Sequence, residues 1–236
     1  EDEEFCRSLA EKSGLVFVTQ KRTETAIPSG WSTEDYLRWE RFRFLDRTAG
    51  ECNADKIALG HHRDDQAETV LLHMIRGSGL DGLKGFLPIR ENRYIRPLIE
   101  VSRKEILEFL EEQGAEWRED ESNESGIYLR NRVRRELMPF LREKYNPKME
   151  QTLARTAEIL RRDDSFIEEC VQEILRSPMI RKTDREISFS ASYVLSLHDA
   201  LVCRVLKSLL ESLAPETGGF SSCHLQALAG LLKQQK

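Results

Sequence analysis

The sequence predicts a doubly wound α/β domain with a mostly parallel sheet, followed by a mostly α-helical domain. Two short apolar runs, Leu15–Thr19 and Lys56–Gly60, have the length and composition of buried parallel strands. A capped segment with helical periodicity separates them, and alternation of strand and helix is the order of an α/β fold. After residue 147 the periodicity is helical, apart from a strand-like run at 186–190. We expect the α/β domain over residues 1–125 and the helical domain over residues 126–236.

Capping residues and helix breakers position the helices. Residues 20–31 contain proline and glycine and are predicted to form a loop, after which Ser32-Thr-Glu-Asp35 has the pattern of a helix N-terminus. Residues 102–114 begin with a serine cap and end with glycine, which predicts another helix. The basic stretch 128–147 is expected to be helical up to Pro139, because proline interrupts the hydrogen bonds of a helix.

The composition excludes several classes of protein. The chain has 236 residues, a net charge of -5 and a pI near 5.7, which argues against indiscriminate coating of nucleic acid but allows a local basic face. Its five cysteines are scattered without a CxxC pair, so we expect neither a disulfide framework nor a cysteine–zinc ribbon. No apolar run approaches the roughly 20 residues that cross a bilayer, and the acidic start is unlike a signal peptide. We therefore expect a cytoplasmic location.

The stretch LGHHRDDQAETV, residues 59–70, places two histidines and two aspartates between a predicted strand and a predicted helix. One interpretation is a helix cap. Asp64 or Asp65 would then cap a helix that begins near Gln66, with Asp65 and Glu68 at capping-box spacing.

Two chemical interpretations of the same stretch are also open. A metal site could use His61, His62 and an aspartate, but no further histidine or cysteine stands at ligand spacing. An acid–base and charge site is the other, because imidazoles titrate near neutrality and a carboxylate can accept a proton or bind an ammonium ion or Mg²⁺.

Several motifs in order along the chain resemble the tRNA(Ile)-lysidine synthetases, which belong to the PP-loop ATP pyrophosphatases. The motifs are LGHHRDDQAETVLLHMIRGSGLDGLKG, YIRPLIEVSRKEILEFL, WREDESN, YLRNRVRRELMPFL and an upstream helix with Glu34, Arg38, Arg41 and Phe42. The resemblance covers nearly the whole chain and implies an adenine nucleotide alpha hydrolase-like fold. One departure is that the family's phosphate loop, SGGxDS after the first strand, is not among these residues. Such a loop holds the pyrophosphate part of ATP, so we expect a catalytic domain truncated at its start, without a complete ATP site.

The resemblance implies a ligase that joins L-lysine to the wobble cytidine of the tRNA(Ile) with a CAU anticodon. In that chemistry the cytosine C2 oxygen attacks the α-phosphate of ATP, pyrophosphate leaves, and the ε-amine of lysine then displaces AMP. The modified tRNA reads AUA instead of AUG. ATP and Mg²⁺, which neutralises phosphate charge, are the implied cofactors, and a homodimer is left open.

The same resemblance suggests roles for single residues. Asp65 would bind or deprotonate the lysine ammonium, His61 would assist near the adenylated base, and Asp64 is a further catalytic candidate. The implied substrate-binding residues are Arg41, His62, Glu68, Arg96, Arg130 and Arg134. No metal-ligating residue is assigned.

The arginines also have purely structural interpretations. Arg130 and Arg134 are four residues apart and share a helix face, so they could bind successive phosphates or a triphosphate. They could also form a solvated basic face with Glu136 and Glu143 as partners. Arg41 could bind substrate, or it could pair with Asp46 or Glu40.

Two rival functions are open. Another PP-loop tRNA-modifying enzyme, such as a thiolating enzyme, would share the α/β core but would be expected to carry cysteines near HHRDD, where none lies. The second rival is a non-catalytic tRNA-binding module. In either case the helical domain is expected to grip tRNA, because a wobble base must be splayed out to reach a pocket.

Overall fold

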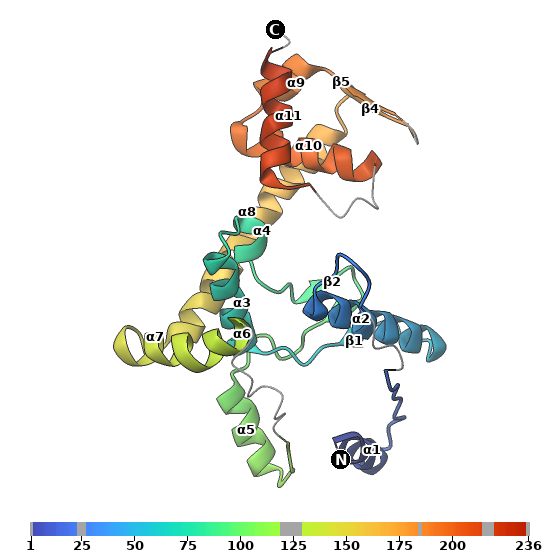
Figure 1. Ribbon diagram of the computed structural model, residues 1–236, viewed down its shortest axis with the longest axis vertical. Helices are drawn as coiled ribbons and strands as arrows, with labels where there is room; N and C mark the ends of the chain where they lie inside the picture. The colour runs from blue at the N-terminus through green and yellow to red at the C-terminus, as the bar shows by residue number, and fades with distance from the viewer. Residues whose placement is uncertain (1, 23–26, 119–128, 184–185, 214–219, 235–236) are drawn as a thin grey trace. The chain divides into compact units, whose positions relative to one another are not determined.

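The computed structural model describes residues 2–22, 27–118, 129–183, 186–213 and 220–234. The chain divides into two compact units, Glu1–Ala157 and Glu158–Lys236. Figure 1 labels most of their helices and strands. The domain boundary that we expected, between residues 125 and 126, lies outside the described residues, as does most of the WREDESN motif.

A small three-stranded sheet lies in the first unit. It consists of β1 (Ile57–Ala58), β2 (Ile89–Arg90) and β3 (Tyr94–Ile95), in the order β1-β3-β2. β1 pairs parallel with β3, and β2 pairs antiparallel with β3, so the described sheet is mixed and not mostly parallel. The strand predicted over Lys56–Gly60 is confirmed in its central residues.

The strand predicted at Leu15–Thr19 is wrong for the described structure. These residues form no strand, and Leu15 and Val16 are 67% and 87% exposed. An apolar, β-branched run becomes a strand only where a neighbour satisfies its backbone N–H and C=O groups. No described strand pairs with this run, and its composition alone does not provide such a partner.

Among the helices of the first unit are α1 (Asp2–Lys12), α2 (Thr33–Glu51), α3 (Arg63–Ile75), α4 (Leu80–Leu83) and α5 (Arg103–Glu112). Two of these helices begin where serine caps predict them, and a third, α3, begins earlier than expected. Ser32 Oγ accepts from the Asp35 N–H at 3.1 Å, and Ser102 Oγ accepts from the Glu105 N–H at 3.2 Å. These contacts confirm both predicted serine caps.

Helix α3 begins three residues earlier than expected. Its N-cap is His62, and Asp65 Oδ2 accepts from the His62 N–H at 3.1 Å. The predicted start near Gln66 and the predicted capping pair of Asp65 with Glu68 are therefore wrong. Glu68 instead lies one turn further along the helix, where it makes ion pairs.

A continuous helical rod follows, made of α6 (Leu129–Arg132), the π-helical segment η2 (Val133–Leu137) and α7 (Met138–Lys144). The expected stop at Pro139 is wrong. The Met138 N–H donates to Val133 O, five residues back, so the chain forms a wider turn just before the proline. Pro139 then stands in the first turn of α7, where a missing N–H is tolerated.

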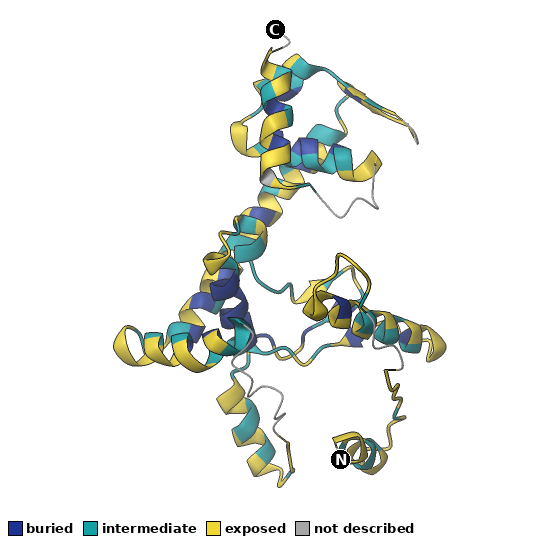
Figure 2. Cartoon of the chain, in the orientation of Figure 1, coloured by how far each residue is buried: buried dark blue, intermediate teal, exposed yellow. Residues whose placement is uncertain are grey.

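The main core of the first unit forms where α3 packs against this rod and the start of α8 (Met149–Leu175). Figure 2 shows the concentration of buried residues on α3. The buried members are Ala67, Val70, Leu71, Leu72, Val133, Met138, Leu153 and Ala157. This packing explains why the first unit extends to Ala157, well beyond the boundary expected from sequence.

The second unit combines the rest of α8 with a hairpin and three helices: β4 (Ile180–Lys182), β5 (Ile187–Phe189), α9 (Ala191–Ser196), α10 (Asp199–Leu213) and α11 (Ser222–Gln234). β5 confirms the strand expected at 186–190. Its antiparallel partner β4 was missed, because Ile-Arg-Lys contains a single apolar residue. Among the described helices, none has an apolar stretch of membrane-spanning length.

Candidate active site

A buried ion-pair network joins the N-terminal half of α3 to the helical rod. Arg134 binds Glu68 through two bonds, Nε to Oε1 at 2.6 Å and Nη2 to Oε2 at 2.9 Å, and also donates to Asp65 Oδ1 at 2.9 Å. Arg130 donates to Asp65 Oδ1 at 3.2 Å and to Glu68 Oε2 at 3.3 Å. Asp65 is 8% exposed and Glu68 4%. Two buried carboxylates therefore meet two guanidiniums, and the bond to Glu68 raises the pKa of Arg134.

The spacing of these residues explains why they meet. Asp65 and Glu68 are three residues apart on α3, and Arg130 and Arg134 are four apart on the rod, so each pair lies on one helix face. The predicted alternative, a solvated basic face with Glu136 and Glu143, does not describe Arg130 and Arg134. Their partners are carboxylates more than 60 residues earlier in the chain.

His62 and Asp64 lie beside this network. The His62 ring places Nε2 3.4 Å from Asp65 Oδ2 and Nδ1 3.5 Å from Asp64 Oδ2. Asp64 Oδ2 also accepts from the Arg103 N–H, the first residue of α5, at 2.5 Å. Asp64 therefore links the start of α3 to the start of α5.

His61 faces a different set of partners. Arg96 is only 4% exposed; it donates through Nη1 to Leu87 O at 2.5 Å and through Nε to His61 Nδ1 at 3.3 Å. The His61 ring packs on Phe86 at a centroid distance of 4.4 Å. Burial, followed by the Arg96 charge, lowers the pKa of His61 to about 4. His61 is therefore neutral near pH 7, and because Nδ1 accepts a hydrogen bond, the ring carries its proton on Nε2.

Phe86 is held in place by a residue that the sequence analysis did not single out. The buried Gln66 accepts from the Phe86 N–H at 2.7 Å. A Cβ at Gly85, where φ is +62°, would lie only 2.7 Å from the Gln66 amide. Gly85 therefore shapes a turn, and the turn fits against Gln66.

Arg41 on α2 is exposed and makes no ion pair or hydrogen bond with any described residue. Its predicted structural partners are engaged elsewhere. Asp46 accepts from Arg93 at 2.9 Å and from the Tyr94 hydroxyl at 2.6 Å, and Glu40 pairs with Arg22 at 2.9 Å. The ion-pair interpretation of Arg41 is therefore wrong.

Arg41 belongs to a cationic cluster that we define as Arg38, Arg41, Arg90 and Arg96. Burial and the charges of Arg90, Arg41 and Arg130 lower the pKa of Arg38, and burial, Arg90 and Arg38 lower that of Arg96. The Arg90 guanidinium lies over the Phe42 and Tyr94 rings at 4.9 and 4.4 Å. Arg90 was missed from sequence, because no local motif marks it. Such mutual repulsion favours binding of an anion.

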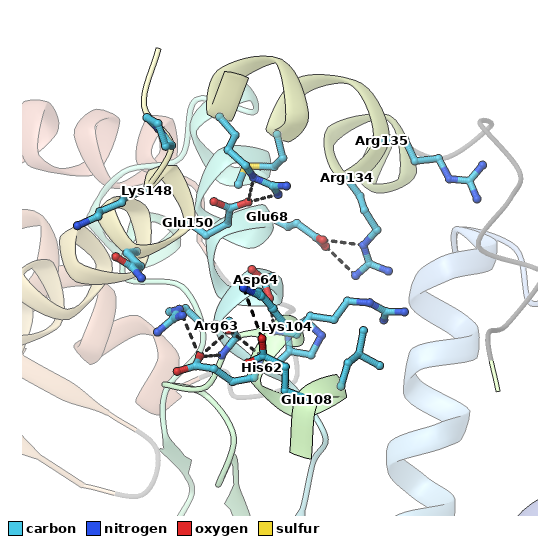
Figure 3. A pocket seen from close by; sticks show the side chains of 18 of the residues that line it. His62, Arg63, Asp64, Glu68, Lys104, Glu108, Arg134, Arg135, Lys148 and Glu150 are labelled. Carbon is cyan, nitrogen blue, oxygen red and sulfur yellow. Dashed lines mark hydrogen bonds and ion pairs between the residues drawn. The ribbon is translucent and has the colours of Figure 1, made fainter. Parts of the chain in front are cut away.

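A cleft of about 1220 Å³ lies next to the network, with Glu68 and Arg134 among its lining residues (Figure 3). Of the predicted residues, His62, Asp64, Glu68 and Arg134 line it, together with residues of α5, α7 and α8. His61, Asp65, Arg41, Arg96 and Arg130 are not among its lining residues. The predicted residues thus form two neighbouring groups, connected through Asp65, Glu68, Arg130 and Arg134. Within the described parts of the chain, no group of three or more His, Cys, Asp or Glu side chains could hold a metal ion.

Comparison with known proteins shows the family to which the chain belongs. The PP-loop domain family matches residues 1–141. The tRNA(Ile)-lysidine synthase of Chlorobaculum tepidum is 32% identical over 99% of this chain and 70% of its own length. The enzymes of the same name from Geobacter sulfurreducens and Clostridioides difficile are 41% and 30% identical over 75% and 98% of the chain. The chain spans only 38% and 51% of the length of these last two relatives.

A solved structure supports the fold alone. The U34-tRNA thiolase NcsA from Methanococcus maripaludis, with its [4Fe-4S] cluster, superposes with a TM-score of 0.54 at 19% identity, over 67% of this chain and 55% of that one. The sequence relationship is more specific than the fold. The chain belongs to the tRNA(Ile)-lysidine synthase family of PP-loop proteins.

Proposed function

We propose that the protein ligates L-lysine to C2 of the wobble cytidine of the tRNA(Ile) with a CAU anticodon, through an adenylated tRNA formed with ATP. The observation that carries this proposal is the buried network around Asp65. It unites residues from two distant segments, both of which carry motifs of the family. The product would read AUA instead of AUG.

The cationic cluster is suited to the phosphate side of the reaction. Attack of the cytosine C2 oxygen on the α-phosphate leaves negative charge on pyrophosphate, and later on AMP. Guanidiniums of Arg41 and Arg96 that lack carboxylate partners among the described residues would stabilise this charge. His61, neutral with its proton on Nε2, would donate a hydrogen bond there and would not act as a strong base.

The carboxylates of α3 are suited to binding the lysine substrate. Asp65 already accepts three hydrogen bonds, from Arg130, Arg134 and the His62 N–H. A carboxylate has roughly four acceptor positions. The His62 ring lies 3.4 Å from Oδ2, so a lysine ammonium would bind at this oxygen beside the imidazole. Asp65 would therefore orient the lysine, while Asp64, which lines the cleft, contributes negative charge and Glu68 holds Arg130 and Arg134 in place.

Mg²⁺ remains an expectation from the family resemblance. The carboxylates Asp65 and Glu68 are already paired with arginines, and no group of metal ligands exists within the described residues. These residues do not fit a preformed metal site. In nucleotide sites Mg²⁺ is often bound mainly by phosphate oxygens, and the chemistry described above does not depend on a protein-bound ion.

The test is lysidine formation by the protein at its natural length, with tRNA(Ile), L-lysine and ATP, and with mass spectrometry of the wobble nucleoside. Asp65→Asn should abolish the product and leave tRNA binding largely intact. The control is Glu108→Gln, because Glu108 lines the same cleft but its side chain is 54% exposed. Full ligation by Asp65→Asn would refute the role of Asp65.

ATP–pyrophosphate exchange separates the rival functions. The ligase should exchange pyrophosphate in the presence of tRNA, because adenylation precedes lysine attack. A tRNA-binding module would bind tRNA without exchange or product. A thiolating enzyme would adenylate tRNA but would give no lysine adduct.

A further inference from the structure

An aromatic cluster at the start of α2 has no part in the network described above. Trp31, Tyr36 and Trp39 all contact one another: Trp31–Tyr36 at 6.0 Å, Trp31–Trp39 at 5.9 Å and Tyr36–Trp39 at 5.7 Å between ring centroids. Tyr36 is buried, 5% exposed, whereas Trp31 and Trp39 are 46% and 42% exposed. Two of the three tryptophans of the chain therefore lie together on the surface.

Arginines surround this cluster. The Arg43 guanidinium lies 5.3 Å from the centroid of the Trp39 ring, and Arg22 lies 5.6 Å from that of Tyr36. Burial and the charges of Arg90, Arg41 and Arg130 lower the pKa of Arg38, next to Trp39 in the chain, whereas Asp35 raises it. The aromatic cluster thus borders the cationic cluster at the candidate active site.

Packing alone explains only part of this arrangement. The rings could simply attach residues 20–22 to α2, since Arg22 pairs with Glu40 and Gln20 accepts from Arg47. That role accounts for the buried Tyr36. It does not account for two tryptophans that remain nearly half exposed beside Arg43, which makes no ion pair with a described residue, since large aromatic rings usually contribute to stability by burial.

We propose that the tryptophan surface, defined as Trp31, Trp39 and Arg43, stacks unpaired bases of the RNA substrate next to the target cytidine. This inference rests on the proposed function for the identity of the RNA. Aromatic rings stack on any base, and neighbouring arginines bind the phosphates between bases. A cationic ligand would be repelled by the same arginines, so the charge around the rings selects a polyanion with flat, apolar groups.

Tryptophan emission reports on this surface directly. Titration with a CAU anticodon stem–loop RNA should quench the emission, because stacked bases quench indole. Trp117→Phe should keep the quenching, since Trp117 is comparably exposed, at 41%, but belongs to no aromatic pair among the described residues. The double variant Trp31→Phe, Trp39→Phe should lose it. Loss of the quenching in Trp117→Phe would overturn the proposal. Equal quenching by a stem–loop whose loop is abasic would also overturn it.

Affinity for the same RNA, measured by fluorescence anisotropy, gives an independent result. Trp39→Leu should weaken binding roughly 5- to 150-fold, the range for loss of one stacked base, and Trp39→Phe should restore most of it. If Trp39→Leu disturbs the helix by circular dichroism, Arg43→Gln replaces it. That variant keeps both rings and should weaken binding and reduce the salt dependence. Unchanged affinity in Trp39→Leu and Arg43→Gln overturns the proposal.

Failure of this inference is distinguishable from failure of the proposed function. A wild-type protein that forms lysidine while its tryptophan variants bind RNA normally would refute the stacking surface alone. A protein that forms no lysidine, but whose Trp31 and Trp39 are quenched by the loop, would refute the ligase and keep the surface.

Discussion

His61 and Arg96 set the chemistry available just beyond the carboxyl end of β1. Arg96 is almost fully buried, yet its hydrogen-bond partners are Leu87 O and His61 Nδ1, with no carboxylate among the described residues. A buried cation without a counter-ion is costly. An anionic group of a substrate would supply the missing charge. The neutral imidazole beside it adds a donor without adding a second positive charge.

The lowered pKa of His61 predicts a pH-dependent contribution to stability. In the unfolded chain a histidine titrates near 6.5, whereas in the folded protein the pKa is about 4. Between these values the unfolded state binds more protons. The contribution of His61 to the free energy of unfolding therefore falls as the pH decreases from about 6.5 towards 4, and it is constant above that window. His61→Gln should remove this component. Urea unfolding of both proteins at several pH values measures it, and equal pH dependence would show that His61 titrates normally.

At the level of elements, the site depends on how α3 is fixed between its neighbours. The Asp65 and Glu68 ion pairs connect it to the rod of α6, η2 and α7, and Asp64 connects it to α5. The hydrophobic core that includes Ala67 and Val70 packs α3 against the same rod. Apolar packing and buried charge therefore fix one arrangement of α3 against the rod.

Elements with local signals were predictable, and those with distant partners were not. The caps at Ser32 and Ser102 depend on residues three positions away, so the sequence displays them. Leu15–Thr19 needs a neighbouring strand that no local pattern reveals. The motif residues of the site were identified by resemblance, but the support of Phe86 by Gln66 required the fold, because the two are 20 residues apart.

Breaking the connection between α3 and the rod should destabilise the protein. Glu68→Gln removes one carboxylate from a buried pair and leaves Arg134 poorly compensated. Since the Arg134 side chain is 35% exposed, we expect a loss of about 3 kcal/mol, at the lower end for buried pairs. Urea unfolding measures the change. The control Glu108→Gln breaks an exposed pair with Lys104, for which we expect at most about 0.5 kcal/mol. Equal losses of stability in Glu68→Gln and Glu108→Gln would mean that the buried pair adds no more stability than the exposed pair.

For the whole chain, the distribution of charge is more informative than the total. The sequence has 36 basic and 41 acidic residues, yet residues 129–148 contain seven basic and two acidic ones. Arg130 and Arg134 neutralise Asp65 and Glu68, while Lys148 makes no ion pair with a described residue. The basic stretch, which we placed in the expected helical domain, thus belongs to the unit Glu1–Ala157, which also carries the candidate site. An acidic protein can bind RNA through such a local basic face.

This distribution predicts steep salt dependence of tRNA binding. Each phosphate contact releases counterions, and about four contacts give a slope of roughly -3 to -4 in a plot of log affinity against log salt. Lys148→Gln should reduce the steepness by about one unit of slope if it binds a phosphate. Lys233→Gln on α11 is the matched control, because Lys233 is exposed and lies outside the basic stretch. Filter binding at several salt concentrations measures all three slopes. A flat response of the wild type would contradict binding through this face, and equal slopes for Lys148→Gln and the wild type would exclude Lys148 from the contact.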